Sequence, residues 1–162
     1  MSYNGYLLSI VLIPVLLSPV LPFISKKSVW LRNILALLLM LVPFYFLCLL
    51  LPEVLSGNII VFSFPFPLGI NFILQADIFA VFTAMASVLI SAVILFYSFE
   101  YIKSYQYQGE YYFIVVLFLG SMMGIIFSAN LIFIYIFWEM TALASWRLIG
   151  FFREKEYVRR AN

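Results

Sequence analysis

The sequence contains no histidine and only one cysteine, Cys48, which lies inside an apolar run. One cysteine cannot form a disulfide within the chain, and no CxxC motif or histidine accompanies it to bind a metal. Haem, iron–sulfur clusters and zinc are held chiefly by these two residue types. We therefore expect no metal site, no cofactor and no redox chemistry belonging to this chain itself.

Charged residues are also scarce. Asp, Glu, Lys and Arg make up 10% of the 162 residues, whereas 66% are hydrophobic. Soluble domains are about half apolar and about a quarter charged. Because so little polar surface is present, the composition predicts an integral membrane protein. The formal net charge of +2 is not gathered into a basic patch with exposed aromatics, which argues against a nucleic-acid partner.

A single all-α membrane domain covering residues 1–162 is expected. A spanning helix needs roughly 20 mostly apolar residues to cross about 30 Å of hydrocarbon. Five stretches qualify, at about 5–24, 31–51, 77–98, 111–128 and 131–151. The first stretch has no basic segment ahead of it, unlike a signal peptide, so we expect it to be retained as a helix. Its prolines, Pro14, Pro19 and Pro22, predict kinks.

The basic residues predict the orientation of the chain in the membrane. They lie in the first connection, in the third connection and in the C-terminal tail: Lys26, Lys27, Arg32, Lys103, Arg153, Lys155, Arg159 and Arg160. The connections at 52–76 and 129–130 contain no Lys or Arg, nor does the N-terminus. Since cytoplasmic loops are enriched in Lys and Arg, we expect the N-terminus outside and the C-terminus in the cytoplasm of a cell membrane.

The long outer loop at 52–76 contains two short runs rich in β-branched and aromatic residues, "NIIVFSF" and "LGINFIL", separated by Pro65 and Pro67. This pattern predicts a small β-hairpin on the outer surface. Lateral contact with a neighbouring protein and a compact cap on the loop are its two possible roles, and the cap is the simpler interpretation.

Glu139 is the most informative residue, because it lies near the middle of the apolar stretch 131–151. It is eight residues into that stretch, or about 12 Å along a helix axis. Ionisable groups at such depth cost roughly 2.5–3.5 kcal/mol on insertion scales, and they usually face a protein interior or a wet cavity where they carry ions or protons. We expect Glu139 to serve ion translocation. A neutral carboxyl that only hydrogen-bonds a neighbouring helix is the structural alternative.

Other polar residues of the same stretch are candidates for a supporting role. Thr141 and Ser145 are four residues apart and share one stripe, but Thr141 is about 200° from Glu139 around the helix. Arg147 is about 80° from Glu139 and roughly 12 Å away, which argues against a direct ion pair. Snorkelling of Arg147 to the interface and a role in the ion path both remain open.

The stretch 111–128 contains "GSMMG", in which Gly120 and Gly124 have the GxxxG spacing. Small residues at this spacing let membrane helices approach closely. We therefore expect Gly120 and Gly124 to serve helix packing. Glu110, in the connection before this stretch, is expected to be solvated.

The segments "ADIFAVF", "YSFEYIKS" and "ANLIFIYIFWEMTALASW" resemble the antiporter-like subunits of respiratory complex I, Mrp-type cation/proton antiporters and membrane-bound hydrogenases. The resemblance is good over residues 75–162 and loose over 1–74. In that family a glutamate in a "WE" pair on the fifth helix loads and releases protons together with a lysine on a broken seventh helix. The resemblance implies that Trp138–Glu139 is this pair and Glu139 the channel glutamate.

Two departures from the family pattern affect what the resemblance implies. Family members have about fourteen helices, whereas five are expected here, so the partner lysine and the broken helices are missing from this chain. The family usually has an apolar or aromatic residue where Arg147 stands. Arg147 either replaces a missing cationic partner or blocks the path.

These observations predict a truncated or split antiporter-like subunit within a larger membrane oxidoreductase, hydrogenase or Mrp-type complex. Its expected partners are other membrane subunits, including a full-length antiporter-like relative, and lipid. The first alternative is a structural membrane module that packs between subunits without an ion path. An independent small exporter that works as an oligomer is another, which the resemblance disfavours. The residues do not discriminate proton from sodium transport.

Overall fold

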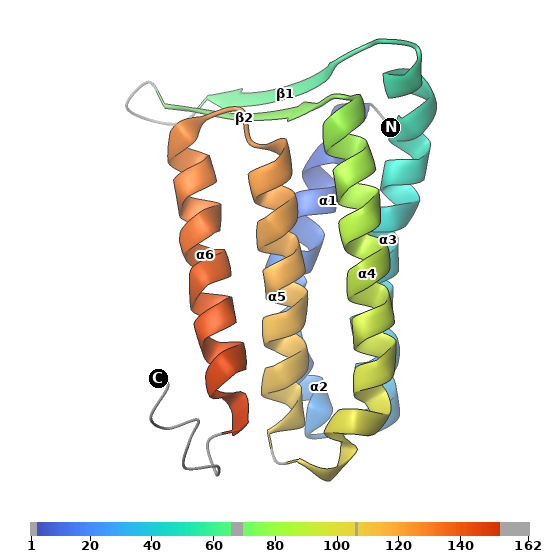
Figure 1. Ribbon diagram of the computed structural model, residues 1–162, viewed down its shortest axis with the longest axis vertical. Coiled ribbons are helices and arrows are strands. Elements are labelled where there is room, and N and C mark those ends of the chain that lie inside the picture. Colours follow the sequence, from blue (N-terminus) through green and yellow to red (C-terminus); the bar gives the residue numbers. More distant parts are fainter. Residues whose placement is uncertain (1–2, 66–69, 106, 153–162) are drawn as a thin grey trace.

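A computed structural model describes residues 3–65, 70–105 and 107–152. It shows a bundle of helices aligned along one axis, with a small sheet across one end (Figure 1). The elements in chain order are α1 (Tyr3–Leu17), α2 (Val20–Ser25), α3 (Val29–Leu55), β1 (Ile60–Pro65), β2 (Asn71–Ala76), α4 (Ile78–Tyr101), η2 (Ile102–Ser104), α5 (Gln108–Phe127), α6 (Leu131–Ile149) and η3 (Gly150–Phe152).

Four of the helices, α3, α4, α5 and α6, are long and apolar enough to cross a membrane. They correspond to the predicted stretches 31–51, 77–98, 111–128 and 131–151, with ends that differ by a few residues. Three begin where a polar side chain accepts a hydrogen bond from a backbone N–H of the first turn: Ser28 before α3, Asp77 before α4 and Asn130 before α6. The prediction of a mostly helical, multi-pass membrane protein is confirmed.

The predicted first span, 5–24, differs because it is divided into two helices. The helix stops at Leu17, and α2 begins at Val20 after Pro19. Proline has no N–H for the ladder and its ring clashes with the preceding turn, which favours a break at this position. The chain does not break at every proline, because Pro14 lies inside α1 and Pro43 inside α3. The Ser18 hydroxyl donates to the Val15 carbonyl at 3.0 Å and so satisfies one group at the break. The kink expected from the prolines is therefore a full interruption.

The helix α5 lies at the centre of the bundle and packs against α1, α2, α4 and α6. Its small residues account for this position, because Gly109, Gly120, Ser121 and Gly124 are all buried. Buried Leu, Ile, Val, Phe and Met side chains from the surrounding helices fill the spaces between them. In contrast, α4 and α6 leave large hydrophobic side chains exposed, including Phe79, Phe96 and Leu131.

A two-stranded antiparallel sheet occupies the long loop for which a hairpin is predicted. Ile60 of β1 pairs with Ala76 of β2, and Pro65 pairs with Asn71. The linking residues 66–69 lie outside the described residues. The sheet covers the end of the bundle (Figure 1) and is tied to the α5–α6 connection, where the Ala129 N–H donates to the Ile73 carbonyl at 2.9 Å.

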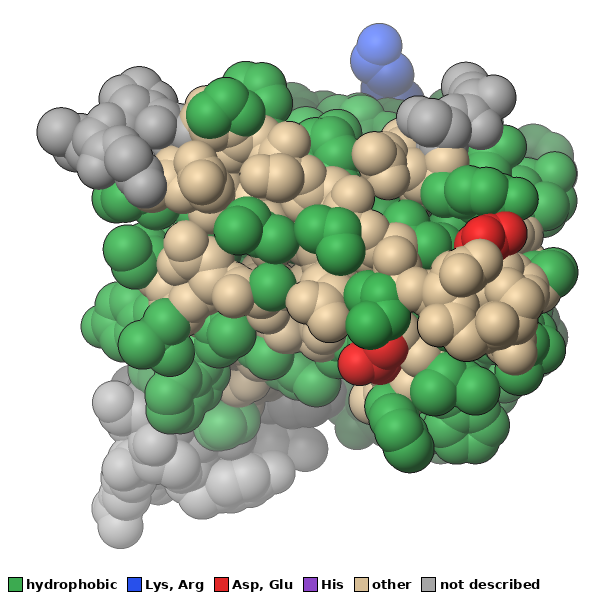
Figure 2. Space-filling view, turned by 90° about the horizontal axis from the view of Figure 1, so that it is seen from above, with side chains coloured by type: hydrophobic (Ala, Val, Ile, Leu, Met, Phe, Trp, Pro, Cys, Tyr) green, Lys and Arg blue, Asp and Glu red, His purple; other side chains and the backbone are tan. Residues whose placement is uncertain are grey.

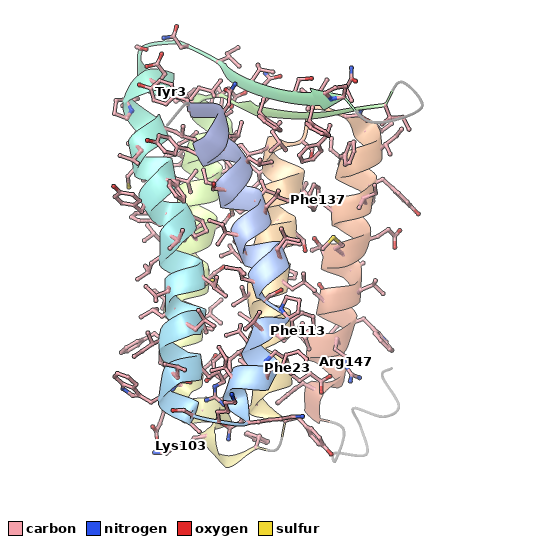
Figure 3. All side chains as sticks on the ribbon, turned by 180° about the vertical axis from the view of Figure 1, so that it is seen from behind. Tyr3, Phe23, Lys103, Phe113, Phe137 and Arg147 are labelled. Atoms are coloured by element: carbon pink, nitrogen blue, oxygen red, sulfur yellow. The ribbon has the colours of Figure 1, made fainter. Side chains whose placement is uncertain are left out.

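The two ends of the bundle differ in charge. Glu53 and Asp77 lie near the sheet end, and few charged side chains are visible on that face (Figure 2). Lys103 and Arg147 lie toward the opposite end (Figure 3). Lys26 and Lys27 belong to the connection between α2 and α3, at that same end. The four basic residues of the tail, for which a cytoplasmic position is predicted, lie outside the described residues: Arg153, Lys155, Arg159 and Arg160.

Candidate functional site

Glu139 lies on the exposed side of α6, away from the interior of this bundle. The helix is fixed at its start by Asn130, whose side-chain oxygen accepts from the Ile132 N–H at 2.9 Å. The Asn130 amide also donates to the Asn71 carbonyl of β2 at 3.0 Å. These contacts place Glu139 about 12 Å from the first residue of α6 along its axis.

The surroundings of Glu139 are large and apolar. Within α6 only Phe137 and Ala144 are buried. We define the exposed face of α6 as Glu139 together with the large hydrophobic side chains that are exposed on this helix. These are Leu131, Ile132, Tyr135, Ile136, Trp138, Leu143, Trp146 and Ile149. Trp138, the other member of the predicted "WE" pair, is thus on the same outward surface, with 64% of its area accessible. The described residues therefore leave this carboxylate uncovered on one side.

Tyr135 is the polar side chain that the structure brings to Glu139. Its hydroxyl belongs to the residue one helical turn before Glu139, and the two side chains interact. The spacing of four residues places both on one stripe of the helix. Tyr135 was not among the residues predicted from the sequence, although its i, i+4 spacing to Glu139 indicates it.

The two predicted hydroxyls, Thr141 and Ser145, are not brought to Glu139. The Thr141 hydroxyl donates to the Phe137 carbonyl, and the Ser145 hydroxyl donates to the Thr141 carbonyl, each at 2.8 Å. Both therefore satisfy the backbone of their own helix, which is the usual arrangement for Ser and Thr within membrane helices.

Arg147 forms an ion pair with Glu110, which belongs to the first turn of α5. The expectation that Glu110 is simply solvated is therefore wrong: its side chain is 29% exposed and joins the end of α6 to the start of α5. The two residues are far apart in sequence, so helix periodicity alone did not reveal the pair. Because the charge of Arg147 is balanced by Glu110, the guanidinium is held at the end of the bundle rather than beside Glu139.

Gly120 and Gly124 lie at two different helix contacts. A Cβ atom at Gly120 would come within 2.7 Å of the Val15 side chain on α1. A Cβ at Gly124 would overlap the ring of Phe137 on α6. The absence of side chains at these positions thus lets α5 approach α1 on one side and α6 on the other.

A second polar group, which the sequence analysis did not find, surrounds Arg32 in the first turn of α3. The sequence pattern placed Arg32 in the first connection, among the exposed basic residues. In the structure its side chain is only 2% exposed. Its Nη1 donates to Gln108 at 2.8 Å and to Ser25 at 3.2 Å, while Nε and Nη2 donate to Asn33. The guanidinium also lies over the ring of Tyr112, 4.4 Å from its centre. The described residues include no cluster of three His, Cys, Asp or Glu side chains suited to a metal ion.

Comparison with known proteins agrees with the resemblance given by the residues. No protein-family model matches the chain. It is 29% identical over 150 residues to the Na(+)/H(+) antiporter subunit A1 of Staphylococcus haemolyticus, covering 90% of this chain and 19% of that protein. It is 30% identical over 118 residues to the subunit A1 of Staphylococcus aureus strain JH9, covering 72% of this chain and 15% of that protein.

The resemblance to the antiporter-like subunit family is confirmed. This chain spans less than a fifth of the length of the two antiporter-like relatives described above. Among solved structures, a chain of the membrane-bound sulfane sulfur reductase, an archaeal respiratory membrane complex, has the same fold, with a TM-score of 0.74 over 86% of this chain and 22% of that one. At 18% identity, this likeness concerns the fold alone.

Proposed function

We propose that this chain forms part of an antiporter-like membrane subunit and that Glu139 supplies a protonatable carboxylate to its proton or sodium path. The position of Glu139 carries the proposal. It lies midway along a membrane helix and interacts with Tyr135, on a face that the described residues leave uncovered. The similarity to Na(+)/H(+) antiporter subunits supports ion transport as the activity.

The exposed face of α6 requires a partner because a charged carboxylate in contact with lipid is costly. Its two indole rings, Trp138 and Trp146, are 64% and 53% exposed and provide a broad apolar surface around the acid. Such a surface suits packing against further membrane helices. We propose that these helices belong to the same antiporter-like subunit or to a neighbouring one, and that they complete the surroundings of Glu139 with polar groups or water.

The proposal includes five membrane crossings, with α1 and α2 together forming the first. The 23 residues from Tyr3 to Ser25, of which Ser18 and Pro19 form the break between the two helices, would extend about 34 Å at 1.5 Å per residue. In Figures 1 and 3 the two helices follow one another from the sheet end of the bundle toward the other end. Lys26, Lys27 and Lys103 support a cytoplasmic position for the end opposite the sheet, with the sheet and the N-terminus outside.

Glu139, Tyr135 and Arg147 of α6 then have distinct roles. Glu139 takes up and releases the proton, or binds the sodium ion, at its carboxylate oxygens. Tyr135 orients the carboxylate by donating its hydroxyl hydrogen. Arg147 acts as a structural residue, because its ion pair with Glu110 fixes the ends of α5 and α6. It is therefore not the replacement for the family's lysine.

The test is ion transport by the assembled membrane protein carrying Glu139→Gln, which keeps the size of the side chain and removes its titration. We expect the flux to fall to that of membranes lacking the complex, while assembly is unchanged. Glu139→Asp should retain partial flux. Glu100→Gln is the matched control, because Glu100 is an exposed carboxylate at the end of α4 that pairs with Lys103 at 3.4 Å. Full flux in Glu139→Gln would refute the proposal and assign the exposed face of α6 to subunit packing.

A further inference from the structure

A cavity of about 450 Å³ opens at the end of the bundle opposite the sheet. Its walls come from α2, from the start of α3 and from the first turn of α5, and they include Ser25, Lys26, Arg32 and Gln108. The close contact of α2 with α5 shapes one side: a Cβ atom at Gly109 would come within 2.7 Å of the Ser25 side chain. The volume is typical of a site for a small molecule or a headgroup.

The charge of Arg32 is not balanced within the described part of the chain. Its four hydrogen bonds go to the neutral oxygens of Ser25, Asn33 and Gln108, and no described carboxylate forms an ion pair with it. Burial of a cation carries a large desolvation cost that neutral acceptors offset only in part. The four bonds use four of the five guanidinium N–H groups, so one N–H on Nη2 and the positive charge remain for a phosphate oxygen.

Two further features of the cavity favour an anion. Lys26 lines it with an exposed, flexible ammonium group. Gln108, Gly109 and Glu110 form the first turn of α5, where the helix dipole favours negative charge. The carboxylate of Glu110 also lines the cavity, but Arg147 balances its charge. The net charge of the lining groups with their ion-pair partners is therefore positive.

We propose that this cavity binds a phosphate-type anion, with Arg32 and Lys26 as its cationic contacts. An anionic phospholipid headgroup at the membrane surface and a free phosphate ion share this chemistry. Basic pockets between membrane helices on the cytoplasmic side are typical sites for anionic headgroups. The proposal does not depend on Glu139, because the cavity and the exposed face of α6 have no residue in common.

The experiment uses the full chain in nanodiscs of phosphatidylglycerol mixed with phosphatidylcholine. Native mass spectrometry counts the phosphatidylglycerol retained, and phosphorus NMR measures the binding of inorganic phosphate in discs of phosphatidylcholine alone. We expect Lys26→Gln to weaken anion binding about fivefold, the effect of one basic residue at an anionic membrane surface. Lys103→Gln, which removes an exposed lysine at the same end, is the control and should leave binding unchanged.

The two arms distinguish the sources of the anion. Retention of phosphatidylglycerol that depends on Lys26 but not on Lys103 supports the proposal with a lipid headgroup as the ligand. Binding of inorganic phosphate with the same dependence, and no lipid preference, supports it with a free anion. Arg32→Lys, which keeps the charge but loses the planar donors, should weaken either form of binding. Binding of neither anion, or equal loss in the Lys26 and Lys103 variants, would overturn the proposal.

Discussion

Arg32 and Glu139 place charge on membrane helices in opposite ways. Arg32 is 2% exposed and donates four hydrogen bonds to side chains of α2, α3 and α5. Glu139 is exposed and interacts with Tyr135 of its own helix. The described residues thus surround the arginine on several sides, whereas they leave the glutamate exposed.

This difference separates two kinds of contribution. Removing a buried donor leaves several acceptors without partners, so Arg32 contributes to the stability of the fold. Glu139 is exposed, so removing its charge should disturb little of the packing between the described helices, and the role proposed for it depends on other protein. The predictions below test this division, from the largest expected effect to the smallest.

Arg32→Met should lower the free energy of unfolding by about 3 kcal/mol, because the oxygens of Gln108, Asn33 and Ser25 lose their charged donor. Equilibrium unfolding of the purified chain in micelles measures the change. Lys27→Met, an exposed neighbour at the same end, is the control and should stay within about 0.5 kcal/mol of the wild type. Equal stability of the Arg32 variant and the wild type would remove the contrast with Glu139.

The contact of α5 with Phe137 on the inner face of α6 should be sensitive to added volume. Gly124→Ala is expected to destabilise the chain by about 1–3 kcal/mol, because the added methyl group overlaps the Phe137 ring. Gly5→Ala is the matched control, since no atom lies within 4 Å of a Cβ at that position in α1. A helical alanine there should stabilise by about 0.5–1 kcal/mol. Thermal unfolding in micelles measures the stability of both variants. If Gly124→Ala left the stability unchanged, α5 and α6 would not be closely packed.

The positions of the helices were predictable from the sequence, whereas the surroundings of the charges were not. Runs of about 20 apolar residues locate α3 to α6, because spanning a membrane requires that length. The prolines predicted kinks in the first span, although they did not predict the complete break at Ser18 and Pro19. The two runs of β-branched and aromatic residues in 52–76 indicated the two paired strands.

The direction in which a membrane side chain points is harder to predict. Lipid-facing and protein-facing residues are both apolar, so the exposed face of α6 looks like its buried face in the sequence. Arg32 was placed in a loop because it follows Lys26 and Lys27, and only the packing of α2 and α5 around it shows that it is buried. The pairing of Arg147 with Glu110 likewise depends on how two helices meet at their ends.

Arg147 allows the effect of burial on stability to be compared with the effect of an ion pair. Arg147 has a carboxylate partner and is 37% exposed, so its ion pair is partly screened by solvent. Arg147→Gln should therefore cost only about 0.5 kcal/mol, much less than the change at Arg32. A double-mutant cycle with Glu110→Gln measures the coupling between the two side chains. A coupling as large as the loss expected at Arg32 would mean that charge pairing, rather than burial, decides stability in this bundle.

Glu139→Gln should have the smallest effect on the isolated chain, within about 0.5 kcal/mol, because the side chain is exposed and interacts with Tyr135 of its own helix. Unfolding in micelles measures it beside Glu100→Gln. A large loss of stability would show that Glu139 is a structural residue of this bundle, as Arg32 is, and the contrast between the two residues would be wrong.

The most direct measurement is infrared difference spectroscopy of the assembled membrane protein while an ion gradient is imposed. If Glu139 exchanges a proton during transport, the wild type shows a carboxylic acid C=O signal that disappears in Glu139→Gln and persists in Glu100→Gln. Should the spectra of wild type and Glu139→Gln be identical under conditions where ions move, the carboxylate takes no part in transport and the account is wrong.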